Sequence, residues 1–152
     1  MAVILIAICA AVLLIGLWFV KRRRDRREVD EHSITPEALH TLLASNPDVL
    51  LYDVRLSLDL LADSEIIPGA TRLDPKDVMK NPALIPKEKD SVVYCTCNSD
   101  ESSRAVLHRA LGMGFSRVRF LKGGLAAWKA SGFPVEPYEK PFDLNSSSVI
   151  AY

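Results

Sequence analysis

The chain has 152 residues, of which 49% are apolar and 25% charged, with 7 glycines and 3 cysteines. This composition excludes collagen-like, disulfide-framework and wholly disordered proteins, and the length allows one domain of ordinary size. The 19 Lys and Arg balance the 19 Asp and Glu, but six cations and one anion lie in residues 21–27, which leaves 13 cations and 18 anions from residue 28 onward. Residues 28–152 therefore have a net charge of −5, which argues against nucleic acid as the main partner.

The first twenty residues form a predicted transmembrane anchor. Residues 2–20 read AVILIAICAAVLLIGLWFV, a run without charge or Pro. At about 1.5 Å per residue such a helix spans roughly 28 Å, close to the bilayer's hydrocarbon thickness of about 30 Å. Trp18 and Phe19 stand where an interfacial aromatic belt lies. No basic residue precedes the run, unlike in a cleaved signal peptide, and the polar stripe of an amphipathic core helix is missing. We therefore expect residues 1–20 to anchor the chain in a lipid bilayer.

Residues 21–32 form a predicted juxtamembrane linker, which begins with the basic run Lys21 to Arg27 (KRRRDRR). Cations that flank a membrane span stay on its cytoplasmic side. We therefore expect a single-pass protein of the cell membrane whose remaining residues face the cytoplasm. The cations also lie where anionic lipid headgroups could meet them, but we expect them to set topology rather than to bind a specific lipid.

The cysteines and histidines predict neither a disulfide framework nor a metal site. Cys9 lies inside the predicted span, while Cys95 and Cys97 are one residue apart. Two such thiols make no disulfide framework, which fits a reducing compartment. No further Cys or His stands at zinc-ligand spacing from them, because the histidines are scattered at His32, His40 and His108. We expect no metal and no cofactor.

From residue 33 the chain alternates helical and strand patterns. Thr35-Pro36 opens a predicted helix, with Thr as N-cap and Pro at the first helical position, and Asn46 ends it. Residues 49–54 (VLLYDV) form a nearly continuous apolar run, typical of a strand buried on both faces. A turn at 67–70 leads into a short strand at 71–73, and a short helix is predicted at 77–80.

The second half of the chain continues this alternation. Strands are predicted at 91–96 and 116–121, on either side of an amphipathic helix at 102–113. The buried side of that helix is expected to carry Val106, Ala110 and Met113. A sharp Gly123-Gly124 turn precedes a helix at 125–131, whose Trp128 is expected in the core. Residues 138–152 are polar and Ser-rich, which predicts a flexible tail.

This alternation predicts a three-layer α/β domain with a mostly parallel central sheet over residues 33–137, preceded by one transmembrane helix. Active sites in such sheets lie at the carboxyl ends of the strands. Cys97 directly follows a core strand, and residues 98–103 then lead into a helix. Backbone amides and a helix N-terminus that converge on a thiol favour its thiolate, which can attack an electron-poor sulfur. Cys95, inside the strand, is expected to be a small buried residue.

Five segments, taken in order, resemble the rhodanese family. They are ITPEALHTLL near residue 34, LLYDVR at 50–55, IPGATRL at 67–73, VVYCTC at 92–97 and MGFSRVRFLKGGLAAWKASGFPVE at 113–136. The resemblance extends from residue 33 to about residue 137. It implies a rhodanese-like domain and a sulfurtransferase that passes a sulfane sulfur from a donor to a thiol or protein acceptor through a cysteine persulfide.

The resemblance also indicates which cysteine is the nucleophile. Family members usually place it 17 residues before the Gly of the Gly-Phe pair that ends the helix. That Gly is Gly114, so the count leads to Cys97, with Cys95 as the second candidate. The substrate-binding loop would then consist of Asn98, Ser99, Asp100, Glu101, Ser102 and Ser103. Asp53 and Arg55 are expected to fix the sheet edge and nearby loops rather than to touch substrate.

The chain departs from the family pattern at two places. Ser102 stands where the loop usually ends in Arg, and Arg104, which begins the helix, is expected to be exposed although it could turn inward. Asp100 and Glu101 each oppose a thiolate or a dianionic substrate by a few tenths to about 1 kcal/mol, so we expect thiosulfate to be a poor substrate. The usual Gly-His before Ile-Pro-Gly-Ala is replaced by Glu65-Ile66.

Three functions from different classes remain open at this point. The first is the sulfurtransferase, with Cys97 as the persulfide carrier. The second is a non-catalytic rhodanese-like binding or scaffold module at the membrane, which the acidic loop and the missing loop Arg favour. The third is a phosphatase, which needs Cys, five residues and then Arg; here six residues separate Cys97 from Arg104. The acidic loop would also repel phosphate, which makes the third function the weakest.

Overall fold

The computed structural model describes residues 12–21, 23, 27, 30–96 and 101–139, with only the backbone of residues 101–105. The chain divides into two compact units, residues 1–32 and 33–152. In the first unit, residues 12–21 are helical and their apolar side chains are exposed. Within the described residues, no helix has both the length and the apolar character that a membrane crossing requires. Residues 2–11 of the predicted span lie outside that part of the chain, so the membrane anchor stays a prediction.

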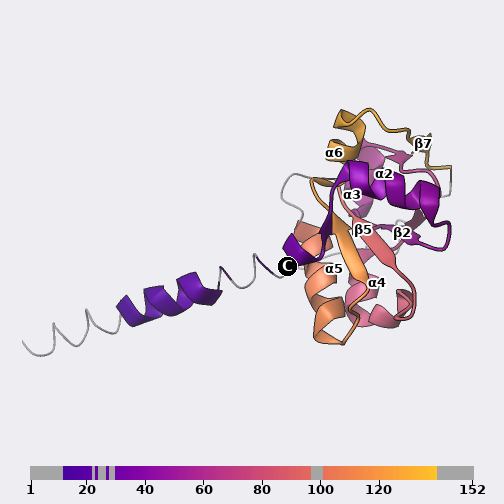
Figure 1. Ribbon diagram of the computed structural model, residues 1–152. Helices are drawn as coiled ribbons and strands as arrows, with labels where there is room; N and C mark the ends of the chain where they lie inside the picture. The colour runs from indigo at the N-terminus through magenta and orange to yellow at the C-terminus, as the bar shows by residue number, and fades with distance from the viewer. Residues whose placement is uncertain (1–11, 22, 24–26, 28–29, 97–100, 140–152) are drawn as a thin grey trace, which may run out of the picture. The chain divides into compact units, whose positions relative to one another are not determined.

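A five-stranded parallel sheet forms the centre of the second unit (Figure 1). Its strands, in spatial order, are β1 (Ser33–Ile34), β6 (Val118–Leu121), β5 (Ser91–Tyr94), β2 (Leu50–Asp53) and β4 (Thr71–Arg72). Every neighbouring pair in this sheet is parallel. The predicted parallel α/β sheet is therefore confirmed.

Helices cover both faces of this sheet, which confirms the three-layer prediction. Figure 1 shows α2 (Pro36–Ser45) and α6 (Gly124–Ala130) on one side, and α4 (Pro75–Lys80) and α5 (Glu101–Gly112) on the other. Alternate strand residues serve the two faces: Val92 and Tyr94 join the core cluster under α2 and α6, whereas Val93, also fully buried, does not belong to that cluster. Trp128 lies in the same cluster, as predicted.

Two of the helix starts follow the expected capping chemistry. Thr35 Oγ1 accepts a hydrogen bond of 3.3 Å from the amide of Ala38, and a Pro occupies the first turn of α2. In the same way, Asp74 Oδ1 accepts a bond of 2.8 Å from the amide of Lys76 at the start of α4. The cap at Thr35 confirms the predicted start of α2, whereas the Asp74 cap, which the sequence analysis did not use, starts α4 two residues before the predicted helix at 77–80.

The prediction for Met113 is wrong, because this side chain is 43% exposed. The helix α5 ends at Gly112, and Gly114 has a φ of 79°, so the chain leaves the helical path before Met113 can continue the buried stripe. Leu107 is fully buried beside Val106 and Ala110 in its place.

The sequence analysis missed five short elements. They are β1, the helix α3 (Ser57–Ala62), and the antiparallel pair of β3 (Glu65–Ile66) with β7 (Glu136–Pro137); a 3-10 turn, η1, spans Pro82–Leu84. The amide of Tyr138 donates a bond of 2.7 Å to the carbonyl of Ser64, so the first residue of the predicted tail is held beside β3. Residues 140–152 of that tail lie outside the described residues.

Candidate active site

The predicted nucleophile follows the carboxyl end of β5, next to the carboxyl end of β2. The amide of Val54 donates a bond of 2.9 Å to the carbonyl of Tyr94, which joins the two chains where both strands end. Cys95 and Thr96 continue from β5 and are the last described residues before α5. Cys97 and the loop residues Asn98, Ser99 and Asp100 lie outside the described residues. Glu101, Ser102, Ser103 and Arg104 belong to the first turns of α5, where the structure describes backbone only.

The Gly123-Gly124 turn holds the exit of β5 in place. The amide of Leu125 donates a bond of 2.8 Å to the carbonyl oxygen of Cys95. Gly124 has a φ of 56°, and a Cβ at this position would lie 2.2 Å from the same oxygen. Only glycine combines that conformation with so close an approach of two backbones. The turn after β6 thus fixes the peptide two residues before Cys97.

The two residues that follow β5, Cys95 and Thr96, differ in how their side chains could contribute to a reaction. Cys95 is 2% exposed, so a dissolved donor does not reach its thiol without local opening. Thr96 Oγ1 is buried and has no hydrogen-bond partner among the described residues. Leaving a buried hydroxyl without a hydrogen-bond partner costs about 1–3 kcal/mol. A group that forms a hydrogen bond with Thr96 Oγ1 would therefore be stabilised at this position.

Asp53 and Arg55 form a buried ion pair at the end of β2. Arg55 Nη2 lies 2.6 Å from Asp53 Oδ2, and the Arg55 side chain is 0% exposed. Nε donates to both carboxylate oxygens at 3.0 and 2.9 Å. Burial lowers the pKa of Arg55, but its hydrogen bonds to Asp53 and the charge of Asp53 outweigh this and raise the pKa overall. The guanidinium therefore stays charged inside the fold.

The same guanidinium ties a loop to the sheet edge. Nη1 donates to the carbonyl of Asp63 and Nη2 to the carbonyl of Glu65, both at 2.8 Å. The pair therefore ties the end of β2 to the segment that leads to β3. Among described residues it makes no group of metal ligands with other side chains.

Two further side chains support this edge, and the sequence analysis missed both. Tyr94 accepts a bond of 3.2 Å at its hydroxyl from the amide of Ile67, and burial, followed by the charge of Asp53, raises its pKa. Arg72 donates to the carbonyl of Arg55 and to Ser57 Oγ, both at 3.0 Å, so it holds the start of α3. These partners are 15 to 27 residues apart in the chain, and no local pattern predicts them.

Lys129 pairs with Glu65, one of the residues at which the sequence departs from the rhodanese pattern. Its Nζ lies 2.6 Å from Asp63 Oδ2 and 2.5 Å from Glu65 Oε2, linking α6 to β3. Burial raises the pKa of Asp63, but the hydrogen bonds from Lys129 and from the Glu65 amide outweigh it and leave the pKa below its ordinary value. Glu65, which replaces a family residue, is thus part of an ion-pair cluster.

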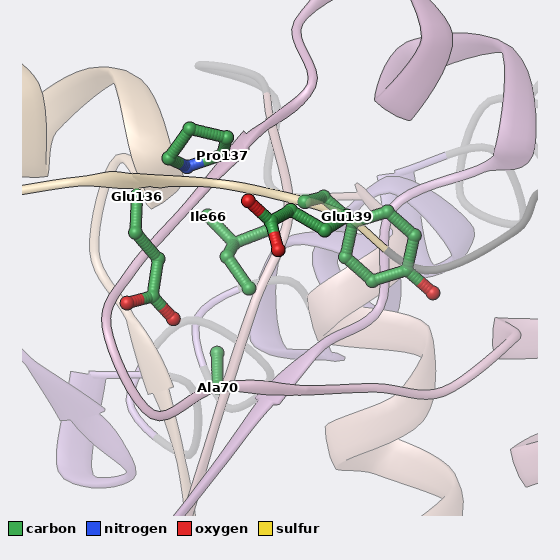
Figure 2. Close-up of a pocket in the computed structure, with 6 residues that line it drawn as sticks. Ile66, Ala70, Glu136, Pro137 and Glu139 are labelled. Carbon is green, nitrogen blue, oxygen red and sulfur yellow. The ribbon is translucent and has the colours of Figure 1, made fainter.

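A separate pocket of about 440 Å³ lies beside β3 and β7 (Figure 2). Its lining combines apolar and acidic side chains: Ile66, Ala70, Glu136, Pro137, Tyr138 and Glu139. In Figure 2, Ile66 lies between Glu136 and Glu139. None of the lining residues is a nucleophile or a cation. Two of its side chains are acidic, which disfavours an anionic sulfur donor, so the candidate site remains at the exit of β5.

Comparison with known proteins agrees with this fold. A family model described as "Rhodanese-like domain" matches residues 35–131. A curated protein named "Sulfurtransferase" from Allochromatium vinosum is 33% identical over 104 residues, covering 68% of this chain and 94% of that protein. The chain belongs to the rhodanese family.

Solved structures show the same fold. A protein from Anabaena sp. is 30% identical in sequence. The match covers 68% of this chain and 82% of that protein, with a TM-score of 0.59. A full-length protein from Lactobacillus plantarum is 22% identical in sequence. The match covers 77% of this chain and 97% of that protein, with a TM-score of 0.64.

Proposed function

We propose that this chain is a membrane-anchored sulfurtransferase of the rhodanese type, in which Cys97 carries the sulfane sulfur as a persulfide. The observation that carries the proposal is the fixed exit of β5, where Leu125 and Gly124 hold the backbone of Cys95 two residues before Cys97. Membership of the rhodanese family and the similarity to a protein named "Sulfurtransferase" support the same chemistry. Cys95 is the weaker candidate for the nucleophile because its thiol is buried.

The proposed reaction has two exchange steps. The Cys97 thiolate attacks the outer sulfur of the donor, the donor's S–S bond breaks, and the rest of the donor leaves with the bonding electron pair. An acceptor thiolate then attacks the terminal sulfur of the persulfide, and Cys97 leaves as a thiolate. Each step forms one S–S bond and breaks another, so neither step needs an external oxidant, metal or cofactor.

The loop residues would stabilise the anionic sulfur. Amides of residues 98–103 and the N-terminus of α5 would favour a thiolate or persulfide at Cys97. Thr96 Oγ1 supplies one more buried group that can bond to the loop. Asp100 and Glu101 add negative charge, which disfavours a dianion such as thiosulfate and favours donors and acceptors of lower charge.

The position at the membrane is part of the proposal. Residues 2–20 would cross the bilayer and residues 21–27 would keep the domain on the cytoplasmic side. A membrane-impermeant maleimide should then leave Cys97 unmodified in intact cells and modify it after permeabilisation. Modification in intact cells would contradict the orientation.

A non-catalytic scaffold is the second candidate, because Ser102 stands in place of the usual loop Arg and the loop carries two acids. Turnover separates the two functions. We would follow sulfide released when the full chain, in a nonionic detergent, transfers sulfur from glutathione persulfide to dithiothreitol. The sulfurtransferase predicts turnover that is lost in Cys97→Ser, is retained in the control Cys9→Ser and is slower with thiosulfate. Absence of turnover with both donors would support the scaffold.

A further inference from the structure

The charge of the domain is strongly polarised. Residues 75–90, which run from α4 to the start of β5, and residues 106–119, which run from α5 into β6, contain seven cations and three anions. The rest of residues 33–137 contains five cations and ten anions. One part of the domain therefore has a net charge of +4, although residues 33–137 together have a net charge of −1. Such a separation of charge orients a protein toward an anionic partner.

Side-chain contacts hold these two cationic segments next to each other. Arg117 Nη1 donates a bond of 2.8 Å to the carbonyl of Glu88, and Arg117 Nε lies 3.0 Å from Asp90 Oδ1. The ammonium of Lys87 lies 4.7 Å from the centroid of the Phe115 ring. The exposed cations around residues 87–89 therefore lie beside those around residues 115–119.

Exposed apolar side chains stand on the same elements. Met79, Leu84 and Met113 are 40%, 41% and 43% exposed. The helix α4 carries Met79 and packs against η1, which carries Leu84, and against α5, which ends directly before Met113 (Figure 1). We call the surface of residues 79–90 and 109–119 the basic face. Apolar side chains among cations are typical of protein surfaces that lie on a bilayer.

The basic face and the exit of β5 lie at opposite ends of the sheet. Lys87 and Lys89 precede β5 and Arg117 precedes β6, whereas Cys95 follows β5. The strand β1 runs parallel to β6, with Ser33 opposite Phe120. The chain therefore enters the sheet from the amino ends of its strands, the end at which the basic face lies. Asp48, in the loop before β2, adds one anion at this end and leaves the excess of cations in place.

We propose that the basic face rests on the anionic headgroups of the bilayer that holds the predicted anchor. This inference rests on the proposed anchor and adds the orientation of the domain. Anionic lipid complements the cations, and Met79, Leu84 and Met113 enter the headgroup boundary beside them. An acidic protein would also match the charges, but the linker of residues 21–32 extends to at most about 40 Å, which keeps the bilayer within reach of the domain. In this orientation the exit of β5 faces away from the lipid, toward water-soluble donors and acceptors.

The test measures how fast individual lysines react in the full chain assembled into nanodiscs. One set of discs contains phosphatidylcholine alone, and in the other phosphatidylglycerol replaces part of it. Peptide mass spectrometry follows a neutral acylating reagent at Lys87 and Lys89, and each rate is divided by the rate at Lys129, which pairs with Asp63 and Glu65 instead. We expect this ratio to be about fivefold lower in the anionic discs, which corresponds to about 1 kcal/mol. High salt should restore it.

Variants locate the lipid contact on the chain. Lys80→Gln with Arg109→Gln removes two exposed cations of the basic face and should bring the ratio in anionic discs most of the way back to its value in phosphatidylcholine. The control Lys122→Gln with Lys140→Gln removes two cations from elsewhere in the chain and should keep the wild-type protection. Because each ratio is measured within one variant, a change in overall reactivity cancels.

The outcomes separate the orientation from the anchor and from sulfur transfer. If the full chain associates with neither kind of disc, the predicted anchor fails and the orientation, which rests on it, fails with it. If the chain is anchored but the ratio is the same in both discs, the orientation alone is overturned, as it would be if an acidic protein covers the basic face. Protection that persists in the Lys80→Gln, Arg109→Gln variant overturns it as well. Sulfur transfer from glutathione persulfide is measured separately, so its failure is distinguished from all of these.

Discussion

The backbone amide of Leu125 donates a hydrogen bond of 2.8 Å to the carbonyl oxygen of Cys95. This contact links the turn after β6 to the chain that leaves β5, 30 residues earlier in sequence. It exists because Gly124 has no side chain to fill the space beside that oxygen. The position of the candidate nucleophile thus depends on a glycine outside its own loop.

Replacing Gly124 with Ala should destabilise the domain and loosen the exit of β5. The matched control is Gly132→Ala, because Gly132 has a similar φ of 75° but an added Cβ there would meet no atom within 4 Å. Both variants lose about 1–2 kcal/mol from the left-handed conformation. Gly124→Ala should lose about 1–3 kcal/mol more, because the added carbon breaks a buried hydrogen bond. Urea denaturation gives both values, and equal losses would contradict the role assigned to Gly124.

The buried pair of Asp53 and Arg55 should be far more important to stability than an exposed pair. Asp53→Ala leaves a fully buried guanidinium without its counter-charge, which costs about 3–5 kcal/mol. The control is Asp90→Ala, which breaks the exposed pair with Arg117 at 3.0 Å and should cost at most about 1 kcal/mol. Chemical denaturation measures both losses. Similar losses would show that the buried pair does not hold the sheet edge.

The ion pair of Asp63 with Lys129 should stabilise the domain only while the carboxyl is charged. The pKa of Asp63 in the folded chain lies below its ordinary value of 3.8. Its contribution is therefore complete above pH 3.8 and is lost as the pH falls through the lowered pKa. Asp63→Asn should cost up to about 1 kcal/mol at neutral pH, since the pair is partly exposed, and nothing at a pH below that pKa. Denaturation at both pH values tests this, and a cost independent of pH would contradict it.

Much of the sheet could be predicted from the sequence because its strands carry strong local signals. The apolar runs around Leu51 and Val92 and the cap at Thr35 act over a few residues. Helix α3 was missed because its N-cap, Leu56, makes no side-chain capping bond and exposed leucines blur its periodicity.

The site was predictable only in part, for a similar reason. Asp53 and Arg55 are two residues apart, so their pairing is visible in the sequence. Tyr94, Arg72 and Lys129 act on partners 15 to 66 residues away, which only the folded chain brings together. Their roles follow from the topology, in which parallel strands collect distant segments at one edge.

The acids of the predicted loop should slow the reaction of Cys97 with alkylating agents. In the Cys95→Ser background, Asp100→Asn with Glu101→Gln removes two negative charges and nearly preserves shape. The thiolate should then form at lower pH, so alkylation at mildly acidic pH should become faster. The gain should shrink at high salt, because screening acts over about 8–10 Å at ordinary ionic strength. An unchanged pH profile would mean that these carboxylates point away from the thiol.

The most direct test of the account is the intact mass of the full chain after incubation with glutathione persulfide. A sulfane sulfur on a single cysteine adds one sulfur atom to the mass, and dithiothreitol removes it. We predict this adduct in the wild-type chain and in the Cys9→Ser and Cys95→Ser variants, and its absence in Cys97→Ser. An adduct that survives in Cys97→Ser and disappears in Cys95→Ser would contradict the assignment of the nucleophile, and a wild-type chain that never gains sulfur would contradict the proposed function.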